Sequence, residues 1–239
     1  MGEVISKKAG RERILDDVRA TLTGASAHAA ETNGSVWGAA ATRLAPIVQL
    51  WDATAGKLAA ARAELAPLEA RVAVANDKGD DELRAVADEV WNLLGRPAND
   101  PVYELLFPGG AGFYADGPDD EQPAMMVLLA ELLESGVAAK LGADAAAKAG
   151  RIRAAAEALA TANDAARKPA ARVKLHERML TAIARVAHVE LAKLKRYLKS
   201  EGLSEADIHA VIPDRPRSYG VSSPGVTPAP TPEPVPDPG

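Results

Sequence analysis

The most regular hydrophobic pattern in the chain runs from residue 37 to residue 75. Apolar residues recur every seven positions in two series, and the second series starts three residues after the first. This spacing continues for longer than a coiled-coil seam requires, and it predicts a helix with one side packed against another helix. The first series is Trp37, Leu44, Trp51, Leu58, Leu65 and Val72, and the second is Ala40, Ile47, Thr54, Ala61, Leu68 and Ala75.

Two prolines lie inside this pattern. Pro46 and Pro67 both fall at the heptad position that faces away from the seam. They can therefore kink a continuous helix without entering the seam. Alternatively the helix proper begins at Pro46, because proline suits the first helical turn.

A second pattern is an internal repeat. The segment "ATAGKLAAARAEL" at residues 53–65 resembles "AKAGRIRAAAEAL" at residues 147–159, and each is later followed by Ala-Asn-Asp. Because Asn and Asp are common turn residues, each copy is expected to turn there and return as a second helix, at residues 81–95 and 169–200. The repeat thus predicts an elongated helical bundle of two pseudo-repeated antiparallel coiled-coil hairpins.

The composition supports an all-α fold. The chain has 239 residues, of which 51 are alanine, the best helix former, and only 4% of its residues are aromatic. No segment shows the alternation of β-branched and polar residues that is typical of a strand. The fold class is therefore predicted to be all-α.

These patterns divide the chain into five parts. An N-terminal amphipathic helix at residues 8–23, which carries Ile14, Leu15, Val18 and Leu22, precedes a small polar segment at residues 23–35 that is a loop or a frayed helix end. A first helical hairpin, a glycine-rich acidic connector and a second helical half follow. The last part has proline at every second position from Pro228 and is expected to be a disordered spacer. The boundaries are residues 1–35, 36–108, 109–123, 124–213 and 214–239.

The stretch "PVYELLFPGGAGFYADGPDDEQP" at residues 101–123 holds both phenylalanines and four glycines. A phosphate-binding loop requires a preceding strand and, in the Walker form, a lysine where this chain has Pro118. The acids of residues 116–121 lack the ligand spacing of an EF-hand, which leaves weak cation binding open. We interpret the stretch as a connecting elbow in which Tyr103 and Phe107 share one helical turn.

The sequence contains no catalytic constellation. There is no cysteine, which excludes thiol chemistry and disulfides. His176 and Glu177 begin a zinc-protease motif, but Leu180 occupies the place of its second histidine. His176 is instead expected to be a buried, hydrogen-bonded histidine. We therefore predict that the protein is not an enzyme and that it binds no cofactor or metal.

Charge is distributed unevenly. Residues 77–134 contain 14 acids and 3 bases, a net charge of −11, whereas residues 167–199 contain 10 bases and 2 acids, a net charge of +8. On a helical wheel, six of these bases lie along one line, the basic stripe: Arg167, Lys174, Arg178, Arg185, Arg196 and Lys199. The stripe is a solvated face, a face that docks on the acidic segment, a track for a phosphate backbone, or a site for an anionic membrane or another acidic partner.

By elimination, the sequence predicts a non-catalytic scaffold or protein–protein interaction protein that associates with itself or with another helical protein. The expected interfaces are the end of the seam at Trp37 and Trp51 and the basic stripe. The alternative is a nucleic-acid-binding accessory protein that uses the basic helix 168–200. No run of residues is apolar enough to span a membrane, and no secretory signal is recognisable, so a cytoplasmic location is expected.

Overall fold

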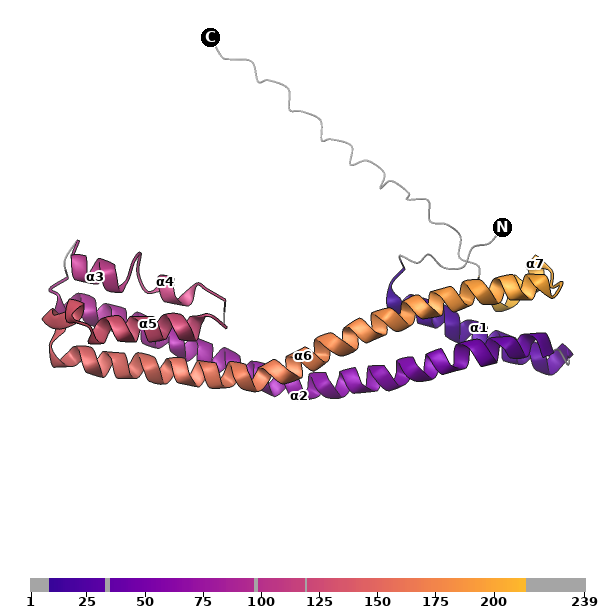
Figure 1. Ribbon diagram of the computed structural model, residues 1–239, viewed down its shortest axis with the longest axis horizontal. Coiled ribbons are helices and arrows are strands. Elements are labelled where there is room, and N and C mark those ends of the chain that lie inside the picture. Colours follow the sequence, from indigo (N-terminus) through magenta and orange to yellow (C-terminus); the bar gives the residue numbers. More distant parts are fainter. Residues whose placement is uncertain (1–8, 33–34, 97–98, 119, 214–239) are drawn as a thin grey trace, which may run out of the picture. The chain divides into compact units, whose positions relative to one another are not determined.

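The computed structural model describes residues 9–32, 35–96, 99–118 and 120–213 (Figure 1). This part of the chain is all-α and contains no strand, as predicted. It divides into two compact units, one made of residues 1–50 and 182–239 and the other of residues 51–181. We call them unit 1 and unit 2. The proline-rich tail predicted for residues 214–239 lies outside the described residues.

Unit 1 contains α1 (Arg11–Thr32), α7 (Glu205–Val211) and the ends of two long helices, α2 (Ser35–Leu93) and α6 (Ala143–Ser200). Helix α1 packs on α7. The amphipathic pattern predicted for the first helix is confirmed, because Ile14, Leu15 and Val18 are buried. Of the two alternatives for the segment that starts at residue 23, the loop is wrong, because α1 continues to Thr32. Its small residues permit close packing, and a Cβ added at Gly24 would lie 3.4 Å from Val211.

Unit 2 contains the remaining lengths of α2 and α6 together with the short elements between them. These are α3 (Pro101–Leu106), α4 (Gly112–Ala115), α5 (Gln122–Glu134) and the 3-10 helix η1 (Gly136–Leu141). Helices α3 and α4 both pack on α5. Their apolar side chains form one core with residues of α2 and α6, among them Leu83, Val90, Phe107, Met126 and Ile152.

The predicted turn at Asn76-Asp77 is wrong, because α2 passes through it without interruption. Asparagine, aspartate and glycine each cost a helix only up to about 1 kcal/mol relative to alanine. Beyond this point α2 buries Leu83, Val86 and Val90, and each such side chain stabilises by roughly 1.5–3 kcal/mol. Burial therefore outweighs the local preference for a turn.

Gly79 and Asp80, which resemble turn residues in the sequence, instead contact α5. A Cβ added at Gly79 would lie 3.5 Å from Met126 Cε, so the glycine allows Met126 to approach the helix closely. The Asp80 carboxylate accepts a hydrogen bond of 2.8 Å from the Gln122 side chain. These residues serve helix packing rather than chain reversal.

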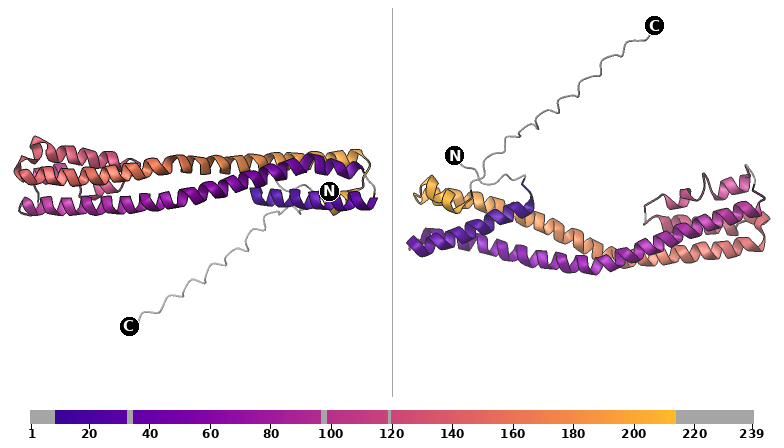
Figure 2. Two further views of the ribbon diagram at one scale, coloured as in Figure 1. Left: turned by 90° about the horizontal axis from the view of Figure 1, so that it is seen from below. Right: turned by 180° about the vertical axis from the view of Figure 1, so that it is seen from behind.

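The corresponding turn at Asn163-Asp164 is also wrong, since α6 runs through it with Pro169 inside. The two halves therefore do not fold back as separate hairpins. Instead α2 and α6 pair with each other in unit 2, through ion pairs of 2.7 Å between Arg62 and Glu177 and between Glu82 and Arg151. The numbering rises along one helix as it falls along the other, so the pair is antiparallel (Figure 2).

The side of α2 predicted to form the seam is buried over most of its length. Trp37, Leu44, Trp51, Leu58 and Leu65 of the first series are all buried, as are the first four residues of the second. Pro46 and Pro67 are exposed and lie inside α2, as the first interpretation of the pattern requires. The seam loosens towards its end, where Leu68, Val72 and Ala75 are half-buried.

The stretch 101–123 contains more regular structure than the connecting elbow that the sequence predicted. The rings of Tyr103 and Phe107 lie 5.4 Å apart, which confirms the predicted helical turn. The residues predicted as a connector include α4, whose buried Tyr114 donates a hydrogen bond of 2.7 Å to the Leu106 carbonyl. This stretch therefore contributes to the core of unit 2.

Candidate interaction surfaces

The basic stripe lies on the exposed side of α6. In unit 2, Arg167, Lys174 and Arg178 are exposed and make no hydrogen bond or ion pair with any described residue. The same holds for Arg185 and Arg196 in unit 1. Five of the six stripe residues therefore keep their charge available, within the described chain, for something outside it.

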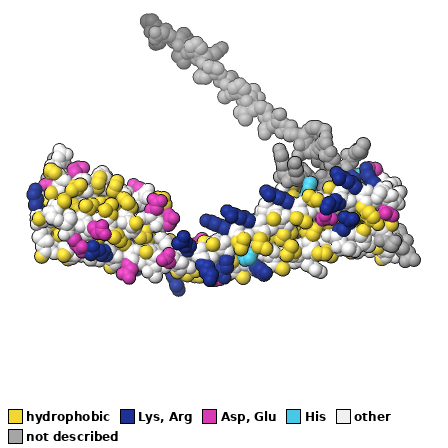
Figure 3. Space-filling view, viewed as in Figure 1, with side chains coloured by type: hydrophobic (Ala, Val, Ile, Leu, Met, Phe, Trp, Pro, Cys, Tyr) yellow, Lys and Arg dark blue, Asp and Glu magenta, His cyan; other side chains and the backbone are white. Residues whose placement is uncertain are grey.

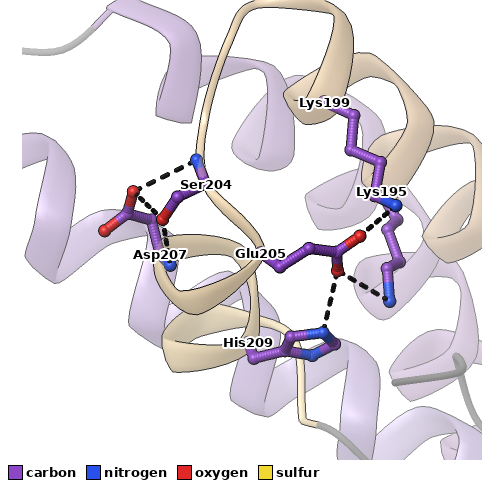
Figure 4. A network of polar contacts seen from close by, with 6 residues as sticks. All are labelled: Lys195, Lys199, Ser204, Glu205, Asp207 and His209. Atoms are coloured by element: carbon purple, nitrogen blue, oxygen red, sulfur yellow. Dashed lines mark hydrogen bonds and ion pairs between the residues drawn. The ribbon is translucent and has the colours of Figure 1, made fainter. Parts of the chain in front are cut away.

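Lys199 differs from the other stripe residues because it has a structural partner. It contacts the Glu205 carboxylate at the start of α7, which also lies 3.8 Å from Lys195 and 3.0 Å from His209 (Figure 4). The hydrogen bond from Lys199 holds the pKa of Glu205 below its usual range. This cluster attaches α7 to α6.

A capping box fixes the start of α7 beside this cluster. The Ser204 hydroxyl accepts a hydrogen bond from the Asp207 backbone, and the Asp207 carboxylate accepts one from the Ser204 backbone (Figure 4). The two reciprocal bonds satisfy backbone N–H groups that the first turn of a helix otherwise leaves unpaired.

The acidic segment pairs with bases that the sequence analysis did not select. Glu89 receives hydrogen bonds of 2.7 Å from Arg151 and 2.8 Å from Lys148, whose side chain is only 10% exposed. Arg153 contacts Glu134 in two bonds of 2.5 and 2.6 Å. All three bases lie at the start of α6, where they face acids of α2 and α5. The sequence does place them in the second copy of the repeat, but it gives no sign of the opposing helix.

The stripe itself shares an open groove with part of the acidic segment. This groove, of about 1040 Å³ in unit 2, is lined by Arg167 and Lys174 of α6, by Asp77 of α2 and by Asp120. No ion pair joins these bases to these acids within the described residues. The structure therefore brings the two charge groups near one groove but leaves both available.

The two tryptophans predicted as an interface are in the interior. Trp37 of unit 1 is 6% exposed, and its ring lies 5.5 Å from that of His28. Trp51 of unit 2 is 7% exposed. Since the chain's own helices cover both side chains, a partner that leaves the helix packing intact must bind elsewhere.

Several large apolar side chains remain exposed. On α6, Leu175 and Met179 are 54% and 38% exposed. On α3, α4 and α5 the exposed residues are Leu105, Phe113, Val127 and Leu128. Figure 3 shows hydrophobic side chains gathered over these three helices, with acidic side chains among them. The sequence analysis did not predict that these side chains are exposed. A helical wheel treats one helix at a time and does not show where a short neighbouring helix leaves a side chain uncovered.

The described residues were compared with the requirements of a metal site. They contain no group of three or more His, Asp or Glu side chains that could hold a metal ion. His176 is half-buried, but its Nδ1 atom lacks the hydrogen bond that was predicted. No helix in this part of the chain has the length and apolarity needed to cross a membrane.

Glu89 is expected to make the stability of the protein depend on pH. Hydrogen bonds from Arg151 and Lys148 hold the pKa of its carboxyl below its usual range. A lowered pKa contributes stability that is present above the unfolded-state value and is lost as the pH falls through the folded-state value. Replacing Glu89 with glutamine should therefore cost about 1 kcal/mol at pH 7, because the carboxyl is partly exposed, and less at pH 3.

Urea denaturation at the two pH values measures this difference. Glu69→Gln is the matched control, because Glu69 is an exposed acid of the same helix without an ion pair among the described residues. An equal loss for Glu89→Gln at both pH values would mean that the charge of Glu89 does not contribute.

The comparisons with known proteins give no further guide. The chain matches no known protein-family model, no curated protein and no solved structure.

Proposed function

We propose that the protein is a non-catalytic helical scaffold that associates with copies of itself or with another helical protein. The observation that carries this proposal is the set of large apolar side chains that unit 2 leaves exposed beside unpaired charges. Leu175 and Met179 lie next to Lys174 and Arg178 on α6, and Phe113 is half exposed on α4. Exposed apolar residues that are bordered by charge are typical of protein interaction sites.

The buried seam gives this scaffold its internal architecture. We propose that α2 and α6 pack as an antiparallel coiled coil within one chain, since the heptad residues of α2 are buried. The two copies of the internal repeat lie at residues 53–65 in α2 and 147–159 in α6. On this reading the pseudo-repeat consists of one long helix per copy instead of one hairpin.

A second candidate function is nucleic-acid binding by the basic stripe. The observation in its favour is that Arg167, Lys174 and Arg178 are exposed and have no ion pair within the described chain. Such side chains can neutralise phosphates without breaking an ion pair within the described chain. The stripe has no exposed aromatic residue for stacking on bases, which favours the scaffold over a single-strand binder.

Light scattering after gel filtration, with absorbance recorded at 260 and 280 nm, distinguishes the two. A scaffold that self-associates should elute at low salt with a mass that is an integral multiple of 24.9 kDa and with the absorbance ratio of pure protein. Excess absorbance at 260 nm that disappears at about 1 M salt, where the Debye length is about 3 Å, would favour nucleic-acid binding. A monomer without nucleic acid at every salt concentration would contradict both self-association and the stripe as a nucleic-acid site.

A further inference from the structure

The first of two complementary surfaces in unit 2 lies on α6. Lys174 and Arg178 are one helical turn apart, and Leu175 and Met179 form a parallel row beside them. All four are exposed, and neither cation has a partner among the described residues. We call these four residues the basic apolar surface.

The second surface lies on α3, α4 and α5. Residues 100–139 contain eight acids and no base, a net charge of −8. Two of these acids are satisfied, because Asp100 caps α3 and Glu134 pairs with Arg153. Glu104, Asp116 and Glu121 are exposed and unpaired within the described chain, and Leu105, Phe113 and Leu128 are 43–50% exposed on the same helices. We call these six residues the acidic apolar surface.

We infer that the basic apolar surface of one copy binds the acidic apolar surface of a second copy. This inference rests on the proposed self-association and names the two surfaces that make the contact. Like surfaces repel, because two copies of the basic apolar surface would bring four unpaired cations together. Unlike surfaces pair charge with charge and bury apolar residues from both sides. Electrostatic complementarity of this kind selects the partner surface and its orientation.

The charges also predict how the contact responds to salt. The attraction between opposite charges on the two surfaces falls with the distance between them and with screening by salt. At about 0.1 M salt the screening length is about 10 Å, and it falls to about 3 Å at 1 M. Association through these surfaces should therefore weaken as salt rises.

Two variants of the full chain test the pairing. The first, Lys174→Glu with Arg178→Glu, reverses the basic apolar surface and leaves the acidic one intact. The second, Leu105→Ser with Phe113→Ser, removes exposed apolar contacts from the acidic apolar surface and introduces no charge. Each variant alone should elute as a monomer of 24.9 kDa at low salt. Since each retains the surface that the other lacks, an equimolar mixture should form a 1:1 dimer of 2 × 24.9 = 49.8 kDa.

The controls separate this inference from the proposed function. Lys57→Glu with Arg71→Glu makes the same charge change at exposed positions of α2 and should leave the mass of the wild-type assembly unchanged. If the wild type is monomeric at every concentration, the proposed self-association is wrong. If the wild type associates but either variant alone keeps its mass, or if the mixture stays monomeric, the chain self-associates by another contact and the inference is overturned. Circular dichroism at 222 nm confirms that each variant is folded.

Discussion

Replacing Asp77 with proline is expected to destabilise unit 2 by about 3 kcal/mol or more. Residue 77 lies inside α2, where proline removes the backbone hydrogen bond to the carbonyl of Ala73 and its ring clashes with that carbonyl. If the chain instead turned at Asn76-Asp77, as the sequence predicted, a four-residue turn that begins at Asn76 would place residue 77 at its second position, which favours proline. A loss of stability on substitution with proline would therefore indicate a continuous helix, whereas unchanged or increased stability would indicate a turn.

Asp77→Ala provides the matched control for this substitution. Asp77 is exposed, and alanine is the better helix former by up to about 0.7 kcal/mol. Alanine should therefore leave the urea midpoint unchanged or raise it, while proline lowers it. A proline variant as stable as the wild type would contradict the continuous helix and restore the turn.

The second large effect is expected from Phe107→Ala, at about 3–5 kcal/mol. Phe107 is 1% exposed and lies between two other rings, at 5.4 Å from Tyr103 and 6.1 Å from Tyr114. Truncation leaves a cavity where α3 and α4 meet the core of unit 2. Only partial collapse is available there, because the Tyr114 hydroxyl is held by its hydrogen bond to the Leu106 carbonyl.

Phe113→Ala is the comparison for Phe107→Ala. The two phenylalanines are six residues apart, but Phe113 is 50% exposed, and surface substitutions usually change stability by no more than about 0.5 kcal/mol. Urea denaturation followed at 222 nm should show a large shift for Phe107 and a small one for Phe113. Similar losses for both would mean that Phe107 does not anchor the core.

The sequence predicted the helices better than it predicted their connections. Burial of Trp37, Leu44 and Leu58 follows directly from their heptad spacing. Residues seven positions apart lie on the same side of a helix, whichever helix packs against that side. Whether the chain turns at a given residue depends on two opposing effects. One is the turn preference of the local residues, and the other is the burial of apolar side chains against helices that are distant in the sequence. Near Asn76 the decisive residues are Leu83, Val86 and Val90, whose burial depends on α5 and α6, and local sequence cannot supply that information.

The candidate surfaces were predictable only in part. The stripe from Arg167 to Arg178 was visible because a helical wheel aligns charges on one helix. The pairing of Glu89 with Lys148 and Arg151 was not visible, because it requires knowledge that α2 and α6 are neighbours. Exposure of Phe113 was hidden for a similar reason, since an aromatic residue beside Tyr114 in an apolar stretch looks equally suited to the core.

The division of the chain into units has a consequence for its synthesis. Unit 2 is continuous, whereas unit 1 joins residues 1–50 to residues 182–239. The buried residues of α1, Ile14, Leu15 and Val18, therefore have no α7 to pack against until Val211 has been made. The interval is 211 − 50 = 161 residues, or about 8–30 s at the usual rates of translation. During that time unit 2 can fold on the ribosome before α1 meets α7.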